Sequence, residues 1–482
     1  MPATVVWFRR DFRVADNPAL RAAVSSGNRL IALYIHSPED DRAWPAGAAS
    51  RWWLHHSLSA LRNQLGDRGI ELIIRKGPTI PALQSVVRDT SASEVHWNRL
   101  YEPAAVALGR QVTTALRADG VVTRSHNAAL LHEPWTVETR SGGPYRAFTP
   151  FWRACRALGD PEPPKPLPSL PAAPAPDGLS NLSVHDLDLL PRIRWDRGLK
   201  ASWRPGEEGA QDRLDAFLQR LAHYPEERDR PASLGTSGLS PHLHFGEIGP
   251  RQIWAAIAQR TAEGRTPGLA GAAEKFRAEL GWREFAHHLL FANPEMPDKP
   301  LDRRFETFPW RDREDGALQA WQDGRTGIPL VDAGMRQLWE TGWMHNRVRM
   351  VVGSFLVKNL RLPWQLGEAW FWDTLVDADL ANNSMGWQWV AGTGADAAPF
   401  FRIFNPVRQG ERFDPEGEYV ARWVPEIAAL PAAYRHAPWA APERLLNGAG
   451  VRLDEVYPRP IVDLKESRKE ALAGFQKIKA AG

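Results

Sequence analysis

The stretch from Leu380 to Pro406, LANNSMGWQWVAGTGADAAPFFRIFNP, combines residue types that seldom occur together in one helix. It holds two tryptophans separated by one residue, an Asn pair before them, and a Gly-Thr-Gly turn. Residues four apart share a helix face, so Asp379, Asn383 and Trp387 would present a carboxylate, an amide and an indole together. Trp389 would lie about 200° further round the helix and face another way. Singly, these residues fit surface polar groups and packed aromatics, but together they suggest a binding site.

A second stretch, KFRAELGWREF, has the same mixture of polar and aromatic side chains. Phe276, Glu279 and Arg283 follow helical spacing, and Trp282 flanks them. Glu279 and Arg283 could equally form a plain surface ion pair, which contributes about 0.2–0.5 kcal/mol.

A third stretch, GWMHNRVRM, places Asn346 and Met350 on one helix face with Arg349 beside them. Met350 fits a core position about as well, because methionine fills irregular gaps between helices.

A fourth stretch, TSGLSPHL, clusters hydroxyl groups at an expected helix start, with Ser240 as the N-cap and Pro241 as the first helical residue. The motif is consistent with a simple helix cap. It is also consistent with a phosphate site, since hydroxyls and unpaired backbone N–H groups at a helix start bind anions.

Several classes of protein find no support in the chain. There is no HExxH, CxxC, GxSxG, GxGxxG or GxxxxGK[ST] motif, and the 14 histidines show no metal spacing, so we expect no metal site. A single cysteine excludes an intrachain disulfide and favours a reducing compartment. The first residues lack the apolar core of a signal peptide, and no apolar run reaches about 18 residues, so we expect a cytoplasmic protein without membrane spans. The net charge of +3 is compatible with a nucleic-acid partner.

The elements that position these residues form two patterns. Over the first 130 residues, β-rich runs alternate with helical patterns, which predicts a doubly wound parallel α/β sheet. The expected strands are Thr4–Phe8, Leu30–Ile35, Glu71–Ile74, Glu94–Trp97 and Val121–Ser125, and the clearest helices are Arg51–Leu65 and Ala104–Arg117.

A proline-rich segment then separates this region from a helical one. Eight prolines in 161–176 exclude regular structure and predict an extended linker. We therefore expect an α/β domain at 1–132, a linker at 133–204 and an all-helical domain at 205–482. The helices expected in the last domain are Gln211–Leu221, Pro250–Thr261, Ala270–Phe291, Leu318–Gln322, Pro329–Thr341, His345–Asn359 and Gly367–Ala378.

These motifs, in this order, resemble the photolyase/cryptochrome family. The resemblance rests on VVWFRRDFRVADNPAL, LYEP, TSGLSPHL, ELGWREF, GRTGIPLVDAGMRQLWETGWMHNRVRM, FWDTLVDADLANNSMGWQW and GTGADAAPFFRIFNP, and it covers nearly the whole chain. Within the family, the chain is most similar to photolyases that repair cyclobutane pyrimidine dimers, in the bacterial class III branch near plant cryptochromes.

The resemblance implies FAD bound in the helical domain. Asp377, paired with Arg349, and Asp379 would match the acidic flavin-binding residues, and Asn383 would face the flavin N5. Phe276 stands where the family usually has tryptophan. The other residues that the resemblance assigns to FAD are Tyr224, Thr236, Ser237, Gly238, Leu239, Ser240 and Arg283.

The resemblance also explains much of the tryptophan content, which is 22 residues. Trp387, Trp364 and Trp310 would match the chain of indoles that carries electrons from the surface to the flavin. Another group could offer a side branch or only pack, and we favour packing for Trp339, Trp343, Trp370 and Trp372.

The lesion contacts implied by the resemblance are Glu279, Trp282, Asn346, Met350 and Trp389. Glu279 would bind the thymine edge and Asn346 a carbonyl, while Arg228 and Arg402 would contact DNA phosphates. The implied activity is light-driven repair by electron transfer from excited reduced FAD to a dimer flipped out of damaged DNA, carried out by a monomer.

Three alternatives stay open at this point. A cryptochrome-type photoreceptor is disfavoured by Trp282, Met350 and Asn383 and by the expected lack of a signalling tail. A (6-4) photolyase is disfavoured because Asn346 stands where that chemistry uses histidine. A flavoprotein oxidoreductase finds no nicotinamide motif. The resemblance also implies an antenna chromophore, for which we favour methenyltetrahydrofolate with Glu102 as a contact; an 8-hydroxy-deazaflavin or an empty site remains open.

Overall fold

The computed structural model describes residues 2–41, 43–166, 169–170, 172–174, 176, 178–264, 266–311, 316–396 and 401–481. The chain forms two compact units, of which the first contains Met1–Ala222 and Ser237–Pro294. The second contains His223–Thr236 and Glu295–Gly482. The predicted functional division at residues 132 and 204 stays a prediction.

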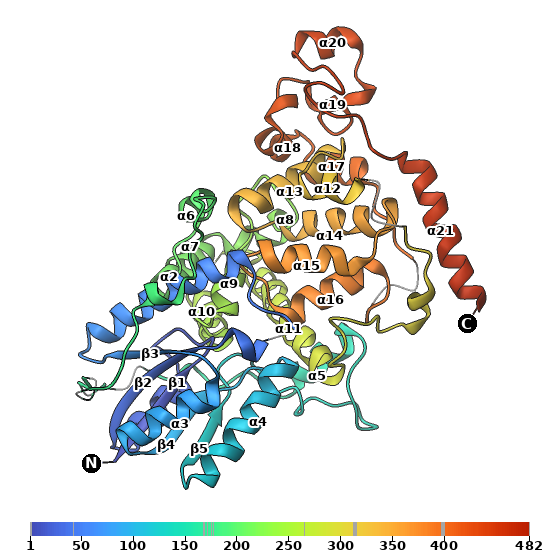
Figure 1. Ribbon diagram of the computed structural model, residues 1–482. Coiled ribbons are helices and arrows are strands. Elements are labelled where there is room, and N and C mark those ends of the chain that lie inside the picture. Colours follow the sequence, from blue (N-terminus) through green and yellow to red (C-terminus); the bar gives the residue numbers. More distant parts are fainter. Residues whose placement is uncertain are drawn as a thin grey trace. The chain divides into compact units, whose positions relative to one another are not determined.

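The first unit is built on a five-stranded parallel sheet with the strand order β3-β2-β1-β4-β5 (Figure 1). Its central strand β1 is buried along its whole length, as expected for a parallel sheet covered by helices. The predicted doubly wound α/β domain is confirmed. The strands are β1 (Ala3–Phe8), β2 (Arg29–His36), β3 (Leu72–Lys76), β4 (Ala92–Asn98) and β5 (Val122–His126).

Helices complete this unit. Each of the first four follows a strand, and α1 begins at the N-cap Asn17, whose side chain accepts a hydrogen bond from Leu20 N at 3.1 Å. The helices of the unit are α1 (Pro18–Ser25), α2 (Ala48–Gly66), α3 (Thr79–Thr90), α4 (Pro103–Ala118), α5 (Phe148–Ala157), α6 (Arg197–Ser202), α7 (Glu207–Arg220), α9 (Ser240–His244), α10 (Pro250–Glu263) and α11 (Leu269–Ala292), with the short 3₁₀ turns η1 (Pro38–Asp41), η2 (Val184–Leu187) and η3 (Leu221–His223).

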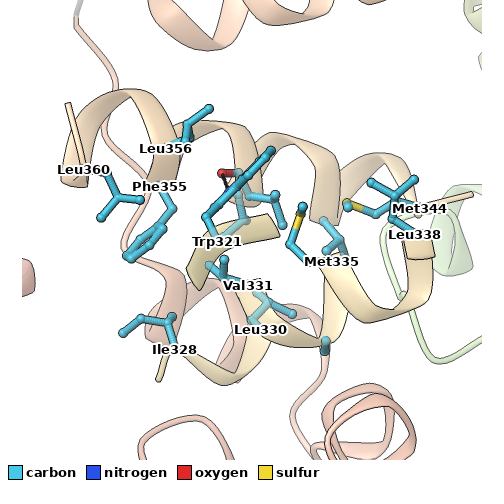
Figure 2. Packing of buried hydrophobic residues seen from close by; sticks show 14 of the residues in the cluster. Trp321, Ile328, Leu330, Val331, Met335, Leu338, Met344, Phe355, Leu356 and Leu360 are labelled. Atoms are coloured by element: carbon cyan, nitrogen blue, oxygen red, sulfur yellow. Dashed lines mark hydrogen bonds between the residues drawn. The ribbon is translucent and has the colours of Figure 1, made fainter. Parts of the chain in front are cut away.

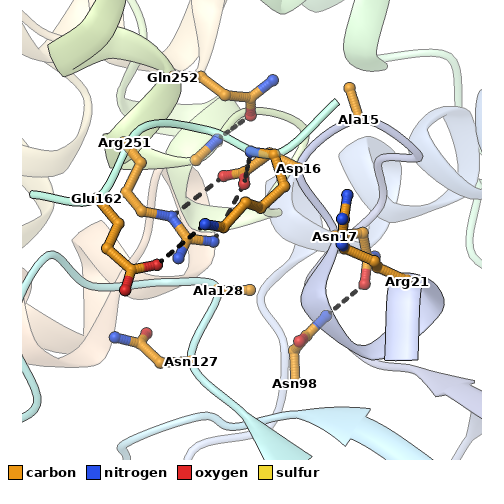
Figure 3. A network of polar contacts seen from close by, with 12 residues as sticks. Ala15, Asp16, Asn17, Arg21, Asn98, Asn127, Ala128, Glu162, Arg251 and Gln252 are labelled. Carbon is orange, nitrogen blue, oxygen red and sulfur yellow. Dashed lines mark hydrogen bonds and ion pairs between the residues drawn. The ribbon is translucent and has the colours of Figure 1, made fainter. Parts of the chain in front are cut away.

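A polar network ties the proline-rich segment to Asp16, in the loop between β1 and α1, and to Arg21 on α1 (Figure 3). The buried carboxylate of Asp16 accepts a hydrogen bond from Lys165 N at 2.9 Å and pairs with Arg251 at 3.2 Å. Arg21 donates to the carbonyl of Pro166 at 3.3 Å. The segment predicted to be an extended linker is therefore fastened to the rest of the first unit at these residues.

The second unit is helical, as predicted. Its core packs α12, α13 and α14 around buried apolar residues that include Trp321, Leu338 and Phe355 (Figure 2). No helix among the described residues is both long enough and apolar enough to cross a membrane. The helices are α8 (Tyr224–Glu227), α12 (Ala317–Gln322), α13 (Pro329–Thr341), α14 (Asn346–Ser354), α15 (Trp364–Thr374), α16 (Leu380–Ala391), α17 (Pro406–Phe413), α18 (Glu418–Trp423), α19 (Ala432–Arg435), α20 (Glu443–Gly448) and α21 (Leu464–Ala481), with η4 (Arg303–Thr307), a π-helical turn η5 (Phe355–Asn359), η6 (Pro425–Ile427) and η7 (Pro438–Ala440).

Two predicted helix ends are wrong, and the predicted starts of α2, α7 and α15 lie three or four residues late. The helix expected at Gly367–Ala378 ends at Thr374, because Leu375 turns to extended backbone and Val376 N donates to Gly342 O at 2.8 Å. The helix expected at His345–Asn359 is α-helical only to Ser354 and continues as the π-helical turn η5.

Candidate active site

The site contains an ion pair between Arg349 and the buried Asp377. Arg349, on α14, donates through Nη2 to both carboxylate oxygens of Asp377, at 3.1 and 2.8 Å. Arg349 Nε also donates to the carbonyl of Met344 at 2.7 Å, which fixes the plane of the guanidinium. The expected pairing of Asp377 with Arg349 is present, and it compensates the burial of the carboxylate.

Asp379 and Asn383 make hydrogen bonds that fix the first half of α16. Asp379 is its N-cap and accepts a hydrogen bond from Asn382 N at 2.9 Å. Asn383 Nδ2 donates to the backbone carbonyl of Glu368 at 3.1 Å. The carboxyl group of Glu368 is itself buried, accepts from Ser384 Oγ at 2.6 Å, and has its pKa raised well above the usual value by burial. Asn383 is thus bonded to the backbone of a residue whose buried carboxyl group has a raised pKa.

The three tryptophans predicted to carry electrons share one apolar cluster and become more exposed along the predicted order. Trp387 and Trp364 are buried within the cluster, whereas Trp310 is only partly buried against it. Trp387 makes an edge contact with Phe371, with ring centroids 4.9 Å apart. A Cβ atom on Gly367 would lie 2.1 Å from the Trp387 ring, so this glycine permits the close approach of α15 and α16.

Two residues predicted to contact the lesion, Asn346 and Met350, lie in the first half of α14. Asn346 is exposed and Met350 is partly buried. His345 caps the helix, and its Nδ1 accepts from Arg347 N at 3.1 Å. Arg347 in turn pairs with Asp229 at 2.9 Å and lies 3.8 Å from the sulfur of Met350. Burial lowers the pKa of His345 to about 4, so the cap is a neutral imidazole.

Trp389 and Arg402 lie together at the other end of α16. Trp389 is partly buried, unlike Trp387, so the two indoles face different ways as predicted. The guanidinium of the exposed Arg402 lies 5.7 Å from the centre of the Trp389 ring. An indole beside a cation can stack on a base next to a phosphate.

The first unit carries the assigned residues of α11. Phe276 is buried against Phe217, with ring centroids 4.4 Å apart. Trp282 stacks on Phe148 at 3.8 Å with a 10° angle between the rings, which fixes the orientation of the indole. Arg283 donates to the carbonyl of Ala129 at 2.6 Å. Glu279 is partly buried on the same helix.

The TSGLS loop differs from the prediction in one respect. The N-cap of α9 is Leu239, so Ser240 is the first helical residue and was wrongly predicted as the cap. The reason is that Ser237 Oγ already accepts from Leu239 N, at 3.3 Å, and Gly238 has a left-handed φ of +65°. A Cβ atom on Gly238 would lie 2.7 Å from Arg213 Nη1, and the left-handed φ independently favours glycine there.

The antenna candidate Glu102 lies in the first unit as the N-cap of α4. It is buried and forms an ion pair with Arg10. Tyr224 and Thr236 belong to the second unit, where Tyr224 is buried and the Arg228 guanidinium lies 5.3 Å from its ring centre.

Sequence reasoning missed three buried polar residues of the second unit. Glu368 follows Trp364 by four positions and precedes Phe371 by three, so the apolar period could have placed it on the buried face. Gln388, which stands between Trp387 and Trp389 in the sequence, is fully buried. Lys358 is also buried and donates to the carbonyl of Ala391, the last residue of α16. Only the identity of their partners, distant in sequence, was beyond prediction.

A parallel α/β unit, a helical unit with buried acidic residues, and indoles graded from buried to partly exposed are the combination of a light-driven flavoprotein. The residues present fit FAD. In the first unit, Gly238 has the left-handed backbone conformation that anion-binding turns use. In the second unit, one carboxyl oxygen of Glu368 is buried without a partner among the described residues.

Comparisons with known proteins agree with this class. Residues 4–172 match the family model described as DNA photolyase, and residues 276–477 match the FAD binding domain of DNA photolyase. A deoxyribodipyrimidine photo-lyase of Agrobacterium fabrum is 47% identical over 98% of this chain and 98% of its own length. The chain belongs to the DNA photolyase family and carries its FAD-binding domain.

Two further relatives show both branches of the family. The crystal structure of a bacterial class III photolyase from Agrobacterium tumefaciens is 46% identical, covers 100% of this chain and 98% of its own, and has a TM-score of 0.95. Cryptochrome-1 of Arabidopsis thaliana is 41% identical over 99% of this chain and 71% of that protein.

Proposed function

We propose that the chain uses blue light to split cyclobutane pyrimidine dimers in DNA. The observation that carries the proposal is that two helices each have two different faces. On α14, Arg349 pairs with the buried Asp377, whereas Asn346 is exposed. On α16, Trp387 is buried, whereas Trp389 is partly exposed. Because a helix is about 10–12 Å across, flavin contacts and lesion contacts would lie within one helix width.

When bound in its fully reduced form, FAD supplies an electron to the dimer under blue light and recovers it after the ring opens. The chain's own residues would bind and orient the flavin and the dimer. Asp377 and Arg349 would hold the isoalloxazine edge, and Asn346 and Met350 would contact the dimer. The dimer must leave the base stack, which costs a few kcal/mol, and stacking on Trp389 would return about 1–3 kcal/mol per base. The other assigned residues keep the roles predicted from the resemblance.

The direct test is repair itself. Photoreduced protein is mixed with an oligonucleotide that carries one thymine dimer, illuminated with blue light, and followed by recovery of ultraviolet base absorbance against a dark control. We expect recovery only in the light. An oligonucleotide with a (6-4) photoproduct should stay unrepaired, and repair of that lesion instead would overturn the dimer specificity.

The second candidate is a cryptochrome-type photoreceptor without repair activity. The 41% identity to a plant cryptochrome over 99% of the chain favours it. The same assay separates the two functions. Protein that binds FAD and photoreduces it, yet leaves the dimer intact, would be a photoreceptor.

We also propose methenyltetrahydrofolate as an antenna, with Glu102 at the start of α4 as one contact. The repair assay tests this at two wavelengths. Added folate should raise the repair rate under near-ultraviolet light and leave the rate under longer blue light unchanged. Equal rates with and without folate at both wavelengths would contradict it. A cytoplasmic location and a monomeric state stay predictions.

A further inference from the structure

The Gly-Thr-Gly turn after α16 is organised around one residue, Gln388. Its backbone carbonyl accepts hydrogen bonds from Gly392 N at 2.9 Å, Thr393 N at 3.0 Å and Gly394 N at 3.1 Å. A Cβ atom on Gly394 would lie 3.0 Å from Gln388 Cβ, so the turn closes directly against this side chain. The glycines therefore fold the chain back onto the last turn of the helix.

The side chain of Gln388 fastens a separate segment to the same place. Its Nε2 donates to the carbonyls of Met296, at 2.6 Å, and Lys299, at 2.9 Å. Its Oε1 accepts from Leu301 N at 2.8 Å and from Thr393 Oγ1 at 3.2 Å. Gln388 has no exposed surface, and its amide uses both donors and both acceptor positions.

These bonds act at the point where a helix would otherwise fray. Trp389 lies in the last turn of α16, which ends at Ala391, and terminal turns open more easily than helix interiors. Trp389 is partly exposed, with Arg402 near its ring, so apolar burial alone does not hold it. An indole that is already oriented loses less conformational freedom when a base stacks on it.

We propose that Gln388 is a positioning residue for lesion binding, which holds Trp389 in its stacking orientation by locking the last turn of α16 to the segment 296–301. The proposal rests on the function proposed above, in which Trp389 contacts the dimer. Trp387 directly precedes Gln388 in the sequence and is held by its packing against Gly367 and Phe371. Electron delivery through Trp387 should therefore not depend on the Gln388 amide.

The test is a double-mutant cycle on the affinity for an oligonucleotide with one thymine dimer. Gln388→Met keeps the side-chain length and removes all four hydrogen bonds. We expect it to weaken binding about tenfold in the wild-type background, within the range for loss of one stacked base. In a Trp389→Ala background the same substitution should change affinity by less than about twofold, because its effect passes through Trp389. Equal losses in both backgrounds would overturn the proposal.

Two controls separate a positioning role from general damage. FAD content and the rate of flavin photoreduction should be unchanged in Gln388→Met. Gln319→Met, which removes an exposed glutamine whose side-chain amide donates to Asp323 in the same unit, should bind the lesion like wild type. If Gln388→Met does not fold, Thr393→Val removes only the hydroxyl donor and should weaken binding about two- to threefold.

A readout without DNA distinguishes failure of this proposal from failure of the proposed function. With 5-fluorotryptophan, the ¹⁹F resonance assigned to Trp389 should be sharp and shifted from random coil in wild type, and should broaden or move in Gln388→Met. An unchanged resonance would refute the positioning role. If wild type binds no lesion but the resonance still moves, the positioning stands and the repair function fails.

Discussion

The tryptophans of the helical unit differ in burial, and we propose that they differ in function accordingly. Trp364 and Trp387 are buried in one apolar cluster, where an indole can exchange electrons with a neighbour without contacting water. Trp389 is partly exposed with a guanidinium close to its ring, where it can stack on a base. In the proposed function, an indole would therefore act as an electron carrier where it is buried and as a stacking platform where it is partly exposed.

The predicted electron route can be tested at Trp364. Trp364→Phe should remove most of the photoreduction of oxidised flavin, because phenylalanine is much harder to oxidise, and should leave repair by chemically reduced enzyme intact. The free energy of unfolding should fall by about 1–2 kcal/mol, less than the loss of about 3–5 kcal/mol that is typical of Trp→Ala. The measurement is the rate of flavin bleaching under blue light.

Trp321→Phe is the matched control for this substitution, since Trp321 is equally buried in the same cluster and its ring centroid lies 6.3 Å from that of Trp387. It should lose similar stability and photoreduce normally. Loss of photoreduction in Trp321→Phe together with normal photoreduction in Trp364→Phe would move the route to Trp321.

At the level of single residues, spacing in the sequence predicted which side chains share a face but not what they bond. The opposite orientation of Trp387 and Trp389 follows from helical geometry alone. The bonds of Gln388 do not, because its partners Met296 and Leu301 are about ninety positions away in the sequence and only the folded chain brings them together.

Among the elements, α14 depends on an unusual cap. His345 is buried and neutral, and its ring nitrogen accepts from Arg347 N. Its pKa is about 4 in the folded chain and about 6.5 when unfolded. As the pH falls, the imidazole is therefore protonated in the unfolded chain before it is protonated in the folded chain. The contribution of His345 to the free energy of unfolding is complete above about pH 6.5 and is lost as the pH falls toward 4.

His345→Asn tests this sign. Asparagine is a good N-cap and does not titrate, so it keeps the hydrogen bond and removes the pH dependence. The urea midpoint of wild type should fall more steeply than that of the variant between pH 6.5 and 4.5. The full difference corresponds to about 3 kcal/mol. Parallel pH profiles for the two proteins would show that His345 titrates normally in the folded chain.

Element boundaries show where local signals were overruled. The strands of the sheet and helix α13 were predicted within a residue or two, because their apolar periods match the buried faces. Helix α15 ends earlier than its pattern suggests because Val376 bonds to Gly342, a partner distant in the sequence that the local pattern around α15 cannot identify. The start of α9 was misplaced because Ser237, not Ser240, supplies the hydroxyl that ends the preceding loop.

For the whole molecule, the balance of charge limits how DNA can be bound. The chain has 60 basic and 57 acidic residues, a net charge of +3, so a general attraction to phosphates is weak. Affinity for damaged DNA should then come from a few phosphate contacts and from stacking on the displaced bases. The two contributions differ in their response to salt, because only phosphate contacts release counterions.

Arg402→Gln and Trp282→Ala should separate these contributions. Arg402→Gln should lower the slope of log Kd against log salt by about 0.9, the value for one lost phosphate contact. Trp282→Ala should weaken binding by about 1–3 kcal/mol at every salt concentration, with the slope unchanged and FAD retained. Trp339→Ala removes a tryptophan that is 60% exposed and has no assigned lesion contact, and should bind like wild type. If Trp282→Ala changed the slope and Arg402→Gln did not, the two roles would have to be exchanged; if neither changed the affinity, the lesion would bind elsewhere on the molecule.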